Sequence, residues 1–350
     1  MINNTFKEIA EKLIKAKTVL LYPHVGIDGD AVGCCVAVSK ALRKIGNKCY
    51  ALYAEDLPEN LKYMYLEGDL DDFRSAQSDD KACLKSYFSD DMNVISDEEL
   101  DISMCVDCGA YDRFVDFKEK FDRAKLTICV DHHGTSEGIA DLNYIDPDAS
   151  ACGELIFELI KEMDKLCPGI LPDREIGEAL FGAITTDTGN FQYSNTTAKT
   201  HKIIAELYDW DIDANGASVE IYENERPSAV MIANRALGRL EMIAGGLGAV
   251  CYVTKEDISE LDVRAGETDQ IVQKIRSIRG VEYAAFIKEK EENVIRVSYR
   301  AKRRGDVSVL AKLHEGGGHI KAAGCTLYMP LEEAVKIIKA DIEEACRNLI

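Results

Sequence analysis

The first half of the chain alternates short apolar runs with stretches of helical period. The apolar runs lie in TVLLYP, KCYALYA, ISMCVDCG and KLTICVDHH, and the helical stretch AVGCCVAVSKALRKIG separates the first two. Apolar runs separated by helices are typical of a mostly parallel sheet that helices cover on both faces. The pattern predicts a doubly wound α/β domain, with an exposed excursion at about 65–100, where Asp, Ser and Lys are frequent.

The second half begins with a helical pattern and then returns to strands. The strand signals are LGAVCYVT and a hairpin, VEYAAFIKEKEENVIRVSYRA, with its turn near Asn293, and the helix LEEAVKIIKADIEEACRNL follows. At 350 residues the chain exceeds the usual size of one domain. We therefore predict an α/β domain at 1–195, a helical linker at 196–240 and a smaller α/β domain at 241–350.

Charge and hydropathy limit the partners. The formal net charge of −20 argues against binding along a long nucleic acid, because that affinity comes largely from basic contacts with phosphates. Local basic density occurs in IRVSYRAKRR, at 295–304, where a small anionic ligand could be held. No apolar stretch approaches the ~20 residues that span a bilayer. The chain is thus expected to bind neither long nucleic acids nor membranes.

The first residues and the cysteines indicate the compartment. MINNTFKEIAEKLIKAK has the pattern of an amphipathic helix with a capping box at Thr5 and Glu8, not that of a signal peptide. Twelve cysteines without framework spacing are expected to be reduced thiols, and the location cytoplasmic. Cys105 and Cys108 form a C-x-x-C within an apparent strand, which places them on opposite faces as packing residues.

The loop after the first apolar run, LYPHVGIDGDAVG, carries the first candidate site. Its glycines do not have the G-x-G-x-x-G spacing of a dinucleotide loop, and two carboxylates there would repel a phosphate. A bound cation resolves the conflict, because His24, Asp28 and Asp30 could converge on metal ions. An ordinary turn with a capping histidine remains the alternative at this point.

Three later segments add side chains of the same kind. They are Asp107 in VDCGAYDR, the DHHG at 131–134 and Asp187 in TTDTGNF. The first two follow apolar runs, so they are expected at the carboxyl ends of strands, where α/β sheets bind ligands. A mixture of His and Asp suits Mn²⁺ or Mg²⁺ better than metals that prefer thiolates.

These motifs, in this order, resemble those of the DHH-family phosphoesterases. The ordered pattern is H-x-x-x-D-x-D, D, DHH and D, followed by the GGGH of the DHH-associated domain. The arrangement is most similar to the branch of oligoribonucleases, or nano-RNases, and pAp phosphatases. RecJ-like and cyclic-dinucleotide enzymes are related to this branch. Two positions depart from the pattern: Ile27 stands where Pro is common, and Glu315 replaces the first of four glycines.

The resemblance implies two divalent cations, with Mn²⁺ expected and Mg²⁺ as the alternative. His24 and Asp28 would hold one metal, Asp30, His132 and Asp187 the other, and Asp107 would bridge them. Two cations about 3.5–4 Å apart can activate a shared water and clamp both oxygens of a displacement. Asp131 would orient an imidazole, and His133 would bind phosphate or assist the leaving group.

The second domain is implied to bind the substrate. Recognition of phosphate or base would come from Arg300, from the backbone of Gly316, Gly317 and Gly318, and from His319. This would bring the scissile bond to the metals across an interdomain cleft. A Gly-rich turn at a helix entry is the structural alternative.

The implied activity is hydrolysis of very short oligoribonucleotides, linear dinucleotides such as pApA and pGpG, or pAp. A cyclic-dinucleotide phosphodiesterase is the nearest alternative, and a nucleotide sensor without activity is a further one. Inorganic pyrophosphatase activity fits less well, because that branch lacks the GGGH-bearing domain. Processive RecJ-type exonuclease activity also fits less well, because the chain is strongly acidic and shows no added nucleic-acid-binding domain. The expected partner is a short nucleotide, and a homodimer is left open.

Overall fold

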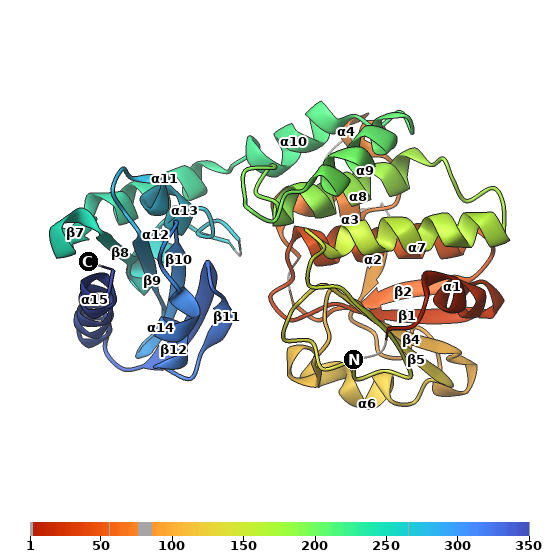
Figure 1. The fold of residues 1–350 in the computed structure, drawn as a ribbon, viewed down its shortest axis with the longest axis horizontal. Coiled ribbons are helices and arrows are strands. Elements are labelled where there is room, and N and C mark those ends of the chain that lie inside the picture. Colours follow the sequence, from red (N-terminus) through yellow and green to blue (C-terminus); the bar gives the residue numbers. More distant parts are fainter. Residues whose placement is uncertain (1–2, 56, 76–85, 265, 350) are drawn as a thin grey trace. The chain divides into compact units, whose positions relative to one another are not determined.

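A computed structural model describes residues 3–55, 57–75, 86–264 and 266–349. The chain divides into two compact units, Met1–Asn224 and Glu225–Ile350, which are described separately (Figure 1). The helices expected in a linker at 196–240 are distributed over both units. α9 (Ala198–Tyr208) and α10 (Ala214–Tyr222) belong to the first unit, and α11 (Pro227–Gly238) belongs to the second.

The first unit contains a six-stranded parallel sheet with the order β3-β2-β1-β4-β5-β6. The strand order reverses between β1 and β4, which is the switch point of a doubly wound fold. The predicted fold class is confirmed. The strands are β1 (Thr18–Tyr22), β2 (Lys48–Leu52), β3 (Phe88–Ser89), β4 (Ile102–Val106), β5 (Leu126–Asp131) and β6 (Leu142–Ile145).

Both faces of this sheet are covered, which explains why its strands are apolar throughout. Val19 and Leu21 pack into one core cluster and Leu20 and Tyr22 into another, as alternating side chains of one strand must. Figure 1 shows α2, α7 and α8 on one side and α6 on the other. The α-helices of this unit, besides α9 and α10, are α1 (Phe6–Lys15), α2 (Gly29–Lys44), α3 (Lys62–Tyr65), α4 (Leu70–Ser75), α6 (Lys118–Phe121), α7 (Cys152–Leu166) and α8 (Arg174–Asp187).

The segment expected to be an exposed excursion at 65–100 is exposed at 90–93 but is integrated into the core at other described positions, where the prediction was wrong. Leu70 and Tyr87 are buried, and β3 extends the sheet beside β2. The carboxylate of Glu178 accepts a hydrogen bond from the backbone N–H of Leu70 at 2.8 Å. The few apolar residues that pack into the core were not recognised because the composition of the segment is polar. Residues 76–85 lie outside the described residues.

The C-x-x-C is also placed differently from the prediction. Both Cys105 and Cys108 pack in the same core cluster rather than on opposite faces. The cause is Asp107, whose φ of 56° turns the chain directly after β4. The eleven cysteines in the described part of the chain are free thiols, in agreement with the expectation that they are reduced.

The second unit contains another six-stranded sheet, with the order β11-β12-β10-β9-β8-β7. β8 and β9 pair in parallel, and the other pairs are antiparallel. The predicted hairpin is β9 and β10. The strands are β7 (Glu241–Ile243), β8 (Gly248–Val253), β9 (Tyr283–Glu291), β10 (Val294–Ala301), β11 (Gly317–His319) and β12 (Ala322–Tyr328).

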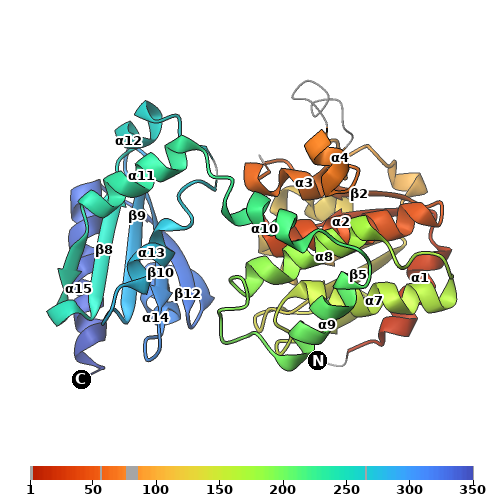
Figure 2. The same ribbon diagram turned by 90° about the horizontal axis from the view of Figure 1, so that it is seen from above.

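Helices cover both faces of the second sheet. Figure 2 shows α15 on one side of β8 and β9 and α11 on the other. The core residues place α14 on the side of α15, and α12 and α13 on the side of α11. Among the described helices, none is long and apolar enough to cross a membrane. The helices not yet given are α12 (Lys255–Glu260), α13 (Ile271–Ser277), α14 (Val307–Lys312) and α15 (Leu331–Arg347).

Candidate metal centre

Three adjacent strands of the first sheet end at one cluster of polar side chains. His24 lies two residues after β1, Asp107 directly follows β4, and Asp131 is the last residue of β5. The φ of 56° at Asp107 is left-handed, a conformation that costs free energy for residues other than glycine and that Asp and Asn tolerate best. Such backbone strain is concentrated at functional sites.

Two helices bring the remaining carboxylates to the same place. Asp28 caps α2, accepting a hydrogen bond from the backbone of Ala31 at 3.1 Å, and Asp30 lies in its first turn. Asp187 is the last residue of α8. The two helices touch closely at Gly33, where an added Cβ would come within 2.3 Å of a backbone oxygen of α8.

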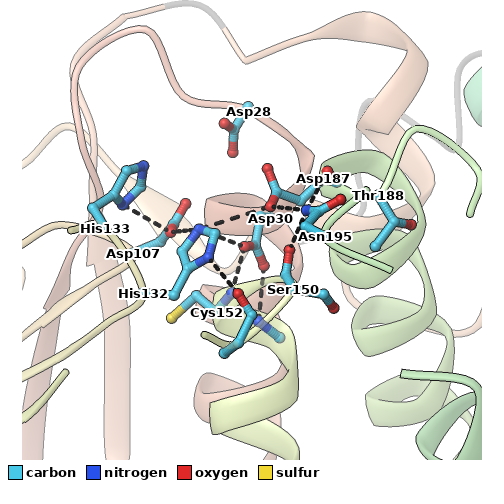
Figure 3. Close-up of polar contacts among 12 residues, drawn as sticks. Asp28, Asp30, Asp107, His132, His133, Ser150, Cys152, Asp187, Thr188 and Asn195 are labelled. Carbon is cyan, nitrogen blue, oxygen red and sulfur yellow. Dashed lines mark hydrogen bonds and ion pairs between the residues drawn. The ribbon is translucent and has the colours of Figure 1, made fainter. Parts of the chain in front are cut away.

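Two groups of these side chains share the carboxylate of Asp107, and Figure 3 shows the second of them, in which Asp30, Asp107 and Asp187 surround His132. In the first group, Nε2 of His24 lies 3.6 Å from oxygens of both Asp28 and Asp107. In the second, Nε2 of His132 lies 3.7 Å from Asp30 and 3.8 Å from Asp187. The other oxygen of Asp107 lies 3.4 Å from the same nitrogen, so the carboxylate of Asp107 stands between the two groups.

The histidine rings are oriented as metal ligands require. Nδ1 of His24 lies 3.0 Å from the carbonyl oxygen of Val25, and Nδ1 of His132 lies 3.2 Å from that of Ala149. A carbonyl can only accept, so Nδ1 carries the proton in both rings. In the neutral rings the Nε2 atoms, which face the carboxylates, therefore have lone pairs for a cation.

Hydrogen bonds hold one carboxylate in place and leave another unsatisfied. Asp30 accepts bonds from the backbone N–H groups of Cys152 at 2.6 Å and Gly153 at 2.9 Å, at the start of α7. By contrast, Oδ1 of Asp107 is buried and has no hydrogen-bond partner in the described part of the molecule. A buried carboxylate oxygen without a donor is costly, and a cation would satisfy it. The residues present therefore fit a metal site.

The ionisation of the cluster leads to the same conclusion. Burial, together with Asp107 and Asp187, raises the pKa of Asp30 well above its usual value. Burial also raises the pKa of Asp187 to about 7, with Asp28 and Asp107 adding to the effect. Burial alone would lower the pKa of His132, but the surrounding carboxylates outweigh it and raise that pKa to about 9. Without a bound cation, these side chains therefore tend to hold protons near neutral pH. This is expected of a site whose negative charge is balanced by cations.

His133 has a different environment from His132. Its Nδ1 lies 2.8 Å from Oδ1 of Asp131, which also accepts the backbone N–H of His132 at 2.8 Å. Asp131 therefore orients His133, whereas the ring of His132 is fixed by a carbonyl. Burial would lower the pKa of His133, but Asp131 and Asp107 outweigh it and raise that pKa. An imidazole whose pKa is raised in this way suits phosphate binding or proton donation beside a metal centre.

If the protein is a phosphoesterase, as the resemblance implies, replacing His133 by Ala should lower the rate of hydrolysis by roughly 10² to 10⁴, the range typical of a positioned acid. Metal content should be unchanged, because Nδ1 of His133 is engaged by Asp131. Turnover and bound metal are measured together, with His201→Ala, an exposed histidine of α9, as the matched control. Loss of metal in His133→Ala would instead make His133 a ligand.

Asn195 belongs to the cluster and was missed in the sequence. Its amide nitrogen lies 2.8 Å from the carbonyl oxygen of Ser150, 3.1 Å from that of Asp187 and 3.5 Å from the Asp187 carboxylate. It thereby fixes the end of α8 against the loop before α7. Asn195 lies eight residues after Asp187 in a polar loop, and no spacing rule links the two.

The residues predicted to bind substrate gather on the second sheet. Arg300 of β10 is paired with Ala322 of β12, which is paired in turn with His319 of β11. The glycine segment is thus an edge strand and not a helix-entry turn. The side chain of His319 lies outside the described part, so its direction is not assigned.

The glycines of this segment have different roles. An added Cβ would come within 2.3 Å of a backbone oxygen at Gly316 and within 2.6 Å of one at Gly318, so both are required by close packing. At Gly317 a Cβ would meet nothing within 4 Å. Glu315, the departure from the family pattern, adopts a φ of 57°, in the region that favours glycine.

Comparison with known protein families agrees with this geometry. A model of the DHH family N-terminal domain matches residues 18–184, and a model of the DHHA1 domain matches residues 247–348. The chain belongs to the DHH family. The DHH match begins with β1 and ends within α8, three residues before Asp187, and the DHHA1 match extends from β8 to α15.

The DHH-family chain is similar to proteins of known name. It is 26% identical over 333 residues to the bifunctional oligoribonuclease and PAP phosphatase NrnA of Bacillus subtilis, covering 95% of each chain. Its fold matches an exopolyphosphatase-related protein of Bacteroides fragilis with a TM-score of 0.83 and 24% identity, over 98% of this chain and 97% of the other. RecJ of Thermus thermophilus in complex with Mn²⁺ matches with a TM-score of 0.55 and 12% identity, over 99% and 55%.

Proposed function

We propose that this protein is a metal-dependent phosphoesterase that hydrolyses very short oligoribonucleotides, linear dinucleotides and pAp. The observation that carries the proposal is the carboxylate of Asp107, which stands between His24 and His132 and belongs to two of the three groups of side chains that could hold a metal ion. The substrate class follows the similarity to a protein named as an oligoribonuclease and PAP phosphatase over 95% of the chain.

Two divalent cations, Mn²⁺ in the first place, are proposed as cofactors. His24 and Asp28 would hold one, Asp30, His132 and Asp187 the other, and Asp107 both. Carboxylates and imidazoles favour Mn²⁺, Mg²⁺ or Zn²⁺. The complex of RecJ with Mn²⁺ supports the choice of Mn²⁺. When bound, such a pair lowers the pKa of a coordinated water and neutralises charge on the phosphoryl oxygens.

The remaining residues are proposed to orient the substrate and transfer the proton. Asp131 holds the imidazole of His133, which donates a proton to the leaving oxygen. Asn195 keeps the carboxylate of Asp187 in position through its contacts with the end of α8. In the second unit, Arg300 and the strand Gly317–His319 bind the substrate, with Gly316 and Gly318 fixing that strand.

A length series tests the proposed substrate class. With Mn²⁺ present, hydrolysis should be fastest for about two to four nucleotides and should fall with length, because a surface with a net charge of −20 repels a longer polyanion. The same panel should contain pAp, cyclic dinucleotides and pyrophosphate, each with and without a chelator.

The outcomes of this panel are distinct. Rates that rise with chain length would reject the proposed class, and faster hydrolysis of cyclic than of linear dinucleotides would make the protein a cyclic-dinucleotide phosphodiesterase. Binding of every nucleotide without turnover in Mn²⁺ would indicate a sensor. The account predicts that pApA and pAp are both hydrolysed and that the chelator abolishes both reactions.

A further inference from the structure

The segment at residues 149–153, which leads from β6 into α7, offers its backbone polar groups to candidate metal ligands (Figure 3). Its first carbonyl, at position 149, accepts the Nδ1–H of His132 at 3.2 Å. Its last two N–H groups donate to the two carboxylate oxygens of Asp30 at 2.6 and 2.9 Å. α7 has no side-chain cap of its own, so Asp30 takes the place of the cap and is stabilised by the amino end of the helix.

The same segment also supports the third carboxylate of the second group. The carbonyl oxygen of Ser150 accepts a hydrogen bond from the amide of Asn195 at 2.8 Å, and that amide lies 3.5 Å from the carboxylate of Asp187. By contrast, His24 and Asp28 of the first group have their backbone hydrogen bonds outside the segment. The 149–153 segment therefore orients the ligands of one group and not the unshared ligands of the other.

A buried carboxylate holds this segment in place. Glu154, in the first turn of α7, is 1% exposed, and its Oε1 accepts hydrogen bonds from Oγ of Ser150 at 2.5 Å and from Oγ1 of Thr200 at 2.6 Å. Ser150 and Thr200 are fully buried, and a buried hydroxyl that loses its partner costs about 1–3 kcal/mol. The carboxylate of Glu154 therefore fixes the 149–153 segment against the first turn of α9.

Glu154 does not itself contact the candidate metal ligands. Its other oxygen, Oε2, lies 3.7 Å from Nζ of Lys199, an exposed residue. In the described part of the chain, the Glu154 carboxylate forms no hydrogen bond with Asp30, His132 or Asp187. Any effect of Glu154 on a bound cation must therefore pass through the hydrogen bonds of the segment.

We propose that Glu154 is a positioning residue for one of the two metals, because it fixes the segment that orients Asp30, His132 and Asp187. The inference rests on the two-metal centre of the proposed function. Groups that hydrogen-bond to metal ligands typically change metal affinity by a factor of 10 to 100. Loss of Glu154 should therefore weaken the metal of the second group and spare the metal of the first.

Calorimetric titration of metal-free protein with Mn²⁺ tests this without any substrate. Two background variants isolate the sites, because Asp28→Asn impairs the first group and Asp187→Asn impairs the second. Adding Glu154→Ala to Asp28→Asn should weaken the remaining Mn²⁺ at least tenfold. Adding it to Asp187→Asn should change the Mn²⁺ affinity less than twofold, because the 149–153 segment orients neither His24 nor Asp28.

Conservative variants in the Asp28→Asn background separate hydrogen bonding from charge. Glu154→Gln keeps an oxygen that accepts both hydroxyls, so its Mn²⁺ affinity should stay within threefold of the background. Thr200→Val removes one donor at nearly constant shape and should weaken Mn²⁺ at least threefold, whereas Thr200→Ser should not. Glu175→Ala removes another buried carboxylate of the first unit, which accepts the N–H of Gly68 at 3.1 Å, and is the matched control with unchanged Mn²⁺ affinity.

The outcomes that contradict the inference are distinct. Equal losses in the two backgrounds would show that Glu154 only stabilises the unit, and no loss in either would show that it has no role at the metals. A loss that persists in Glu154→Gln would assign the effect to charge. If Glu154→Ala does not fold, equal Mn²⁺ affinities of Thr200→Val and Thr200→Ser would overturn the inference. Wild-type protein that binds two Mn²⁺ and hydrolyses no nucleotide would instead reject the proposed function and leave the role of Glu154 in place.

Discussion

Replacing Asp107 by Asn should lower kcat/KM by about 10³ or more. Its carboxylate is shared by both groups of ligands, and the loss of several kcal/mol of charge stabilisation corresponds to a factor of this size. Asn tolerates the left-handed φ of 56° at this position, so the backbone is preserved. The change therefore removes charge and little else.

Thermal unfolding gives a second measurement of the same substitution. A cation present at 100 times its dissociation constant stabilises a protein by about 2.7 kcal/mol, so Mn²⁺ should raise the Tm of the wild type. Asp107→Asn should lose most of this rise, whereas Asp116→Asn, which neutralises an exposed carboxylate of the same unit, should retain it. Near-normal hydrolysis by Asp107→Asn with two bound metals would contradict the bridging role.

Replacing Gly33 by Ala should destabilise the first unit by roughly 2 kcal/mol. A Cβ at this position would lie 2.3 Å from the backbone oxygen of Ala179, and backbone cannot move away as a flexible side chain can. Overpacking typically costs about 1–3 kcal/mol, and the higher helix propensity of Ala recovers at most about 1. Activity should also fall, because separating α2 from α8 moves Asp30 away from Asp187.

Gly134→Ala is the control for this prediction. Gly134 is in the same unit, and a Cβ there would come no closer than 4.0 Å to Pro147. We expect the free energy of unfolding of Gly134→Ala to stay within about 0.5 kcal/mol of the wild type, as for substitutions without a new contact. Equal stability of the two variants would show that the helices are not fixed by the contact at Gly33.

The sequence predicted the first sheet and the convergence of its candidate ligands because both depend on local patterns. Apolar runs marked β1, β4 and β5, and the end of each run located His24, Asp107 and Asp131. In a parallel sheet those ends meet at one edge, so the convergence followed from the fold class. The wrongly predicted side of Cys108 depended on the φ of Asp107, which no pattern of residue types reports.

Features that depend on long-range contacts were not predictable. Asn195 contacts Ser150 and Asp187 only because the loop after α8 folds back over the start of α7. β11 consists of two glycines and a histidine, which have little strand propensity, and it forms because β12 offers an edge. The position of Lys288 beside Arg296 depends on the register of β9 and β10, and register is set by the whole hairpin.

The most direct test of the central claim is the rate of pApA hydrolysis as Mn²⁺ is added to metal-free protein, one equivalent at a time. If Asp107 joins two metal sites into one catalytic centre, the rate should remain well below half its maximum at one bound equivalent and should reach the maximum at two. Full activity at one equivalent, or activity that survives complete removal of metal, would contradict the account.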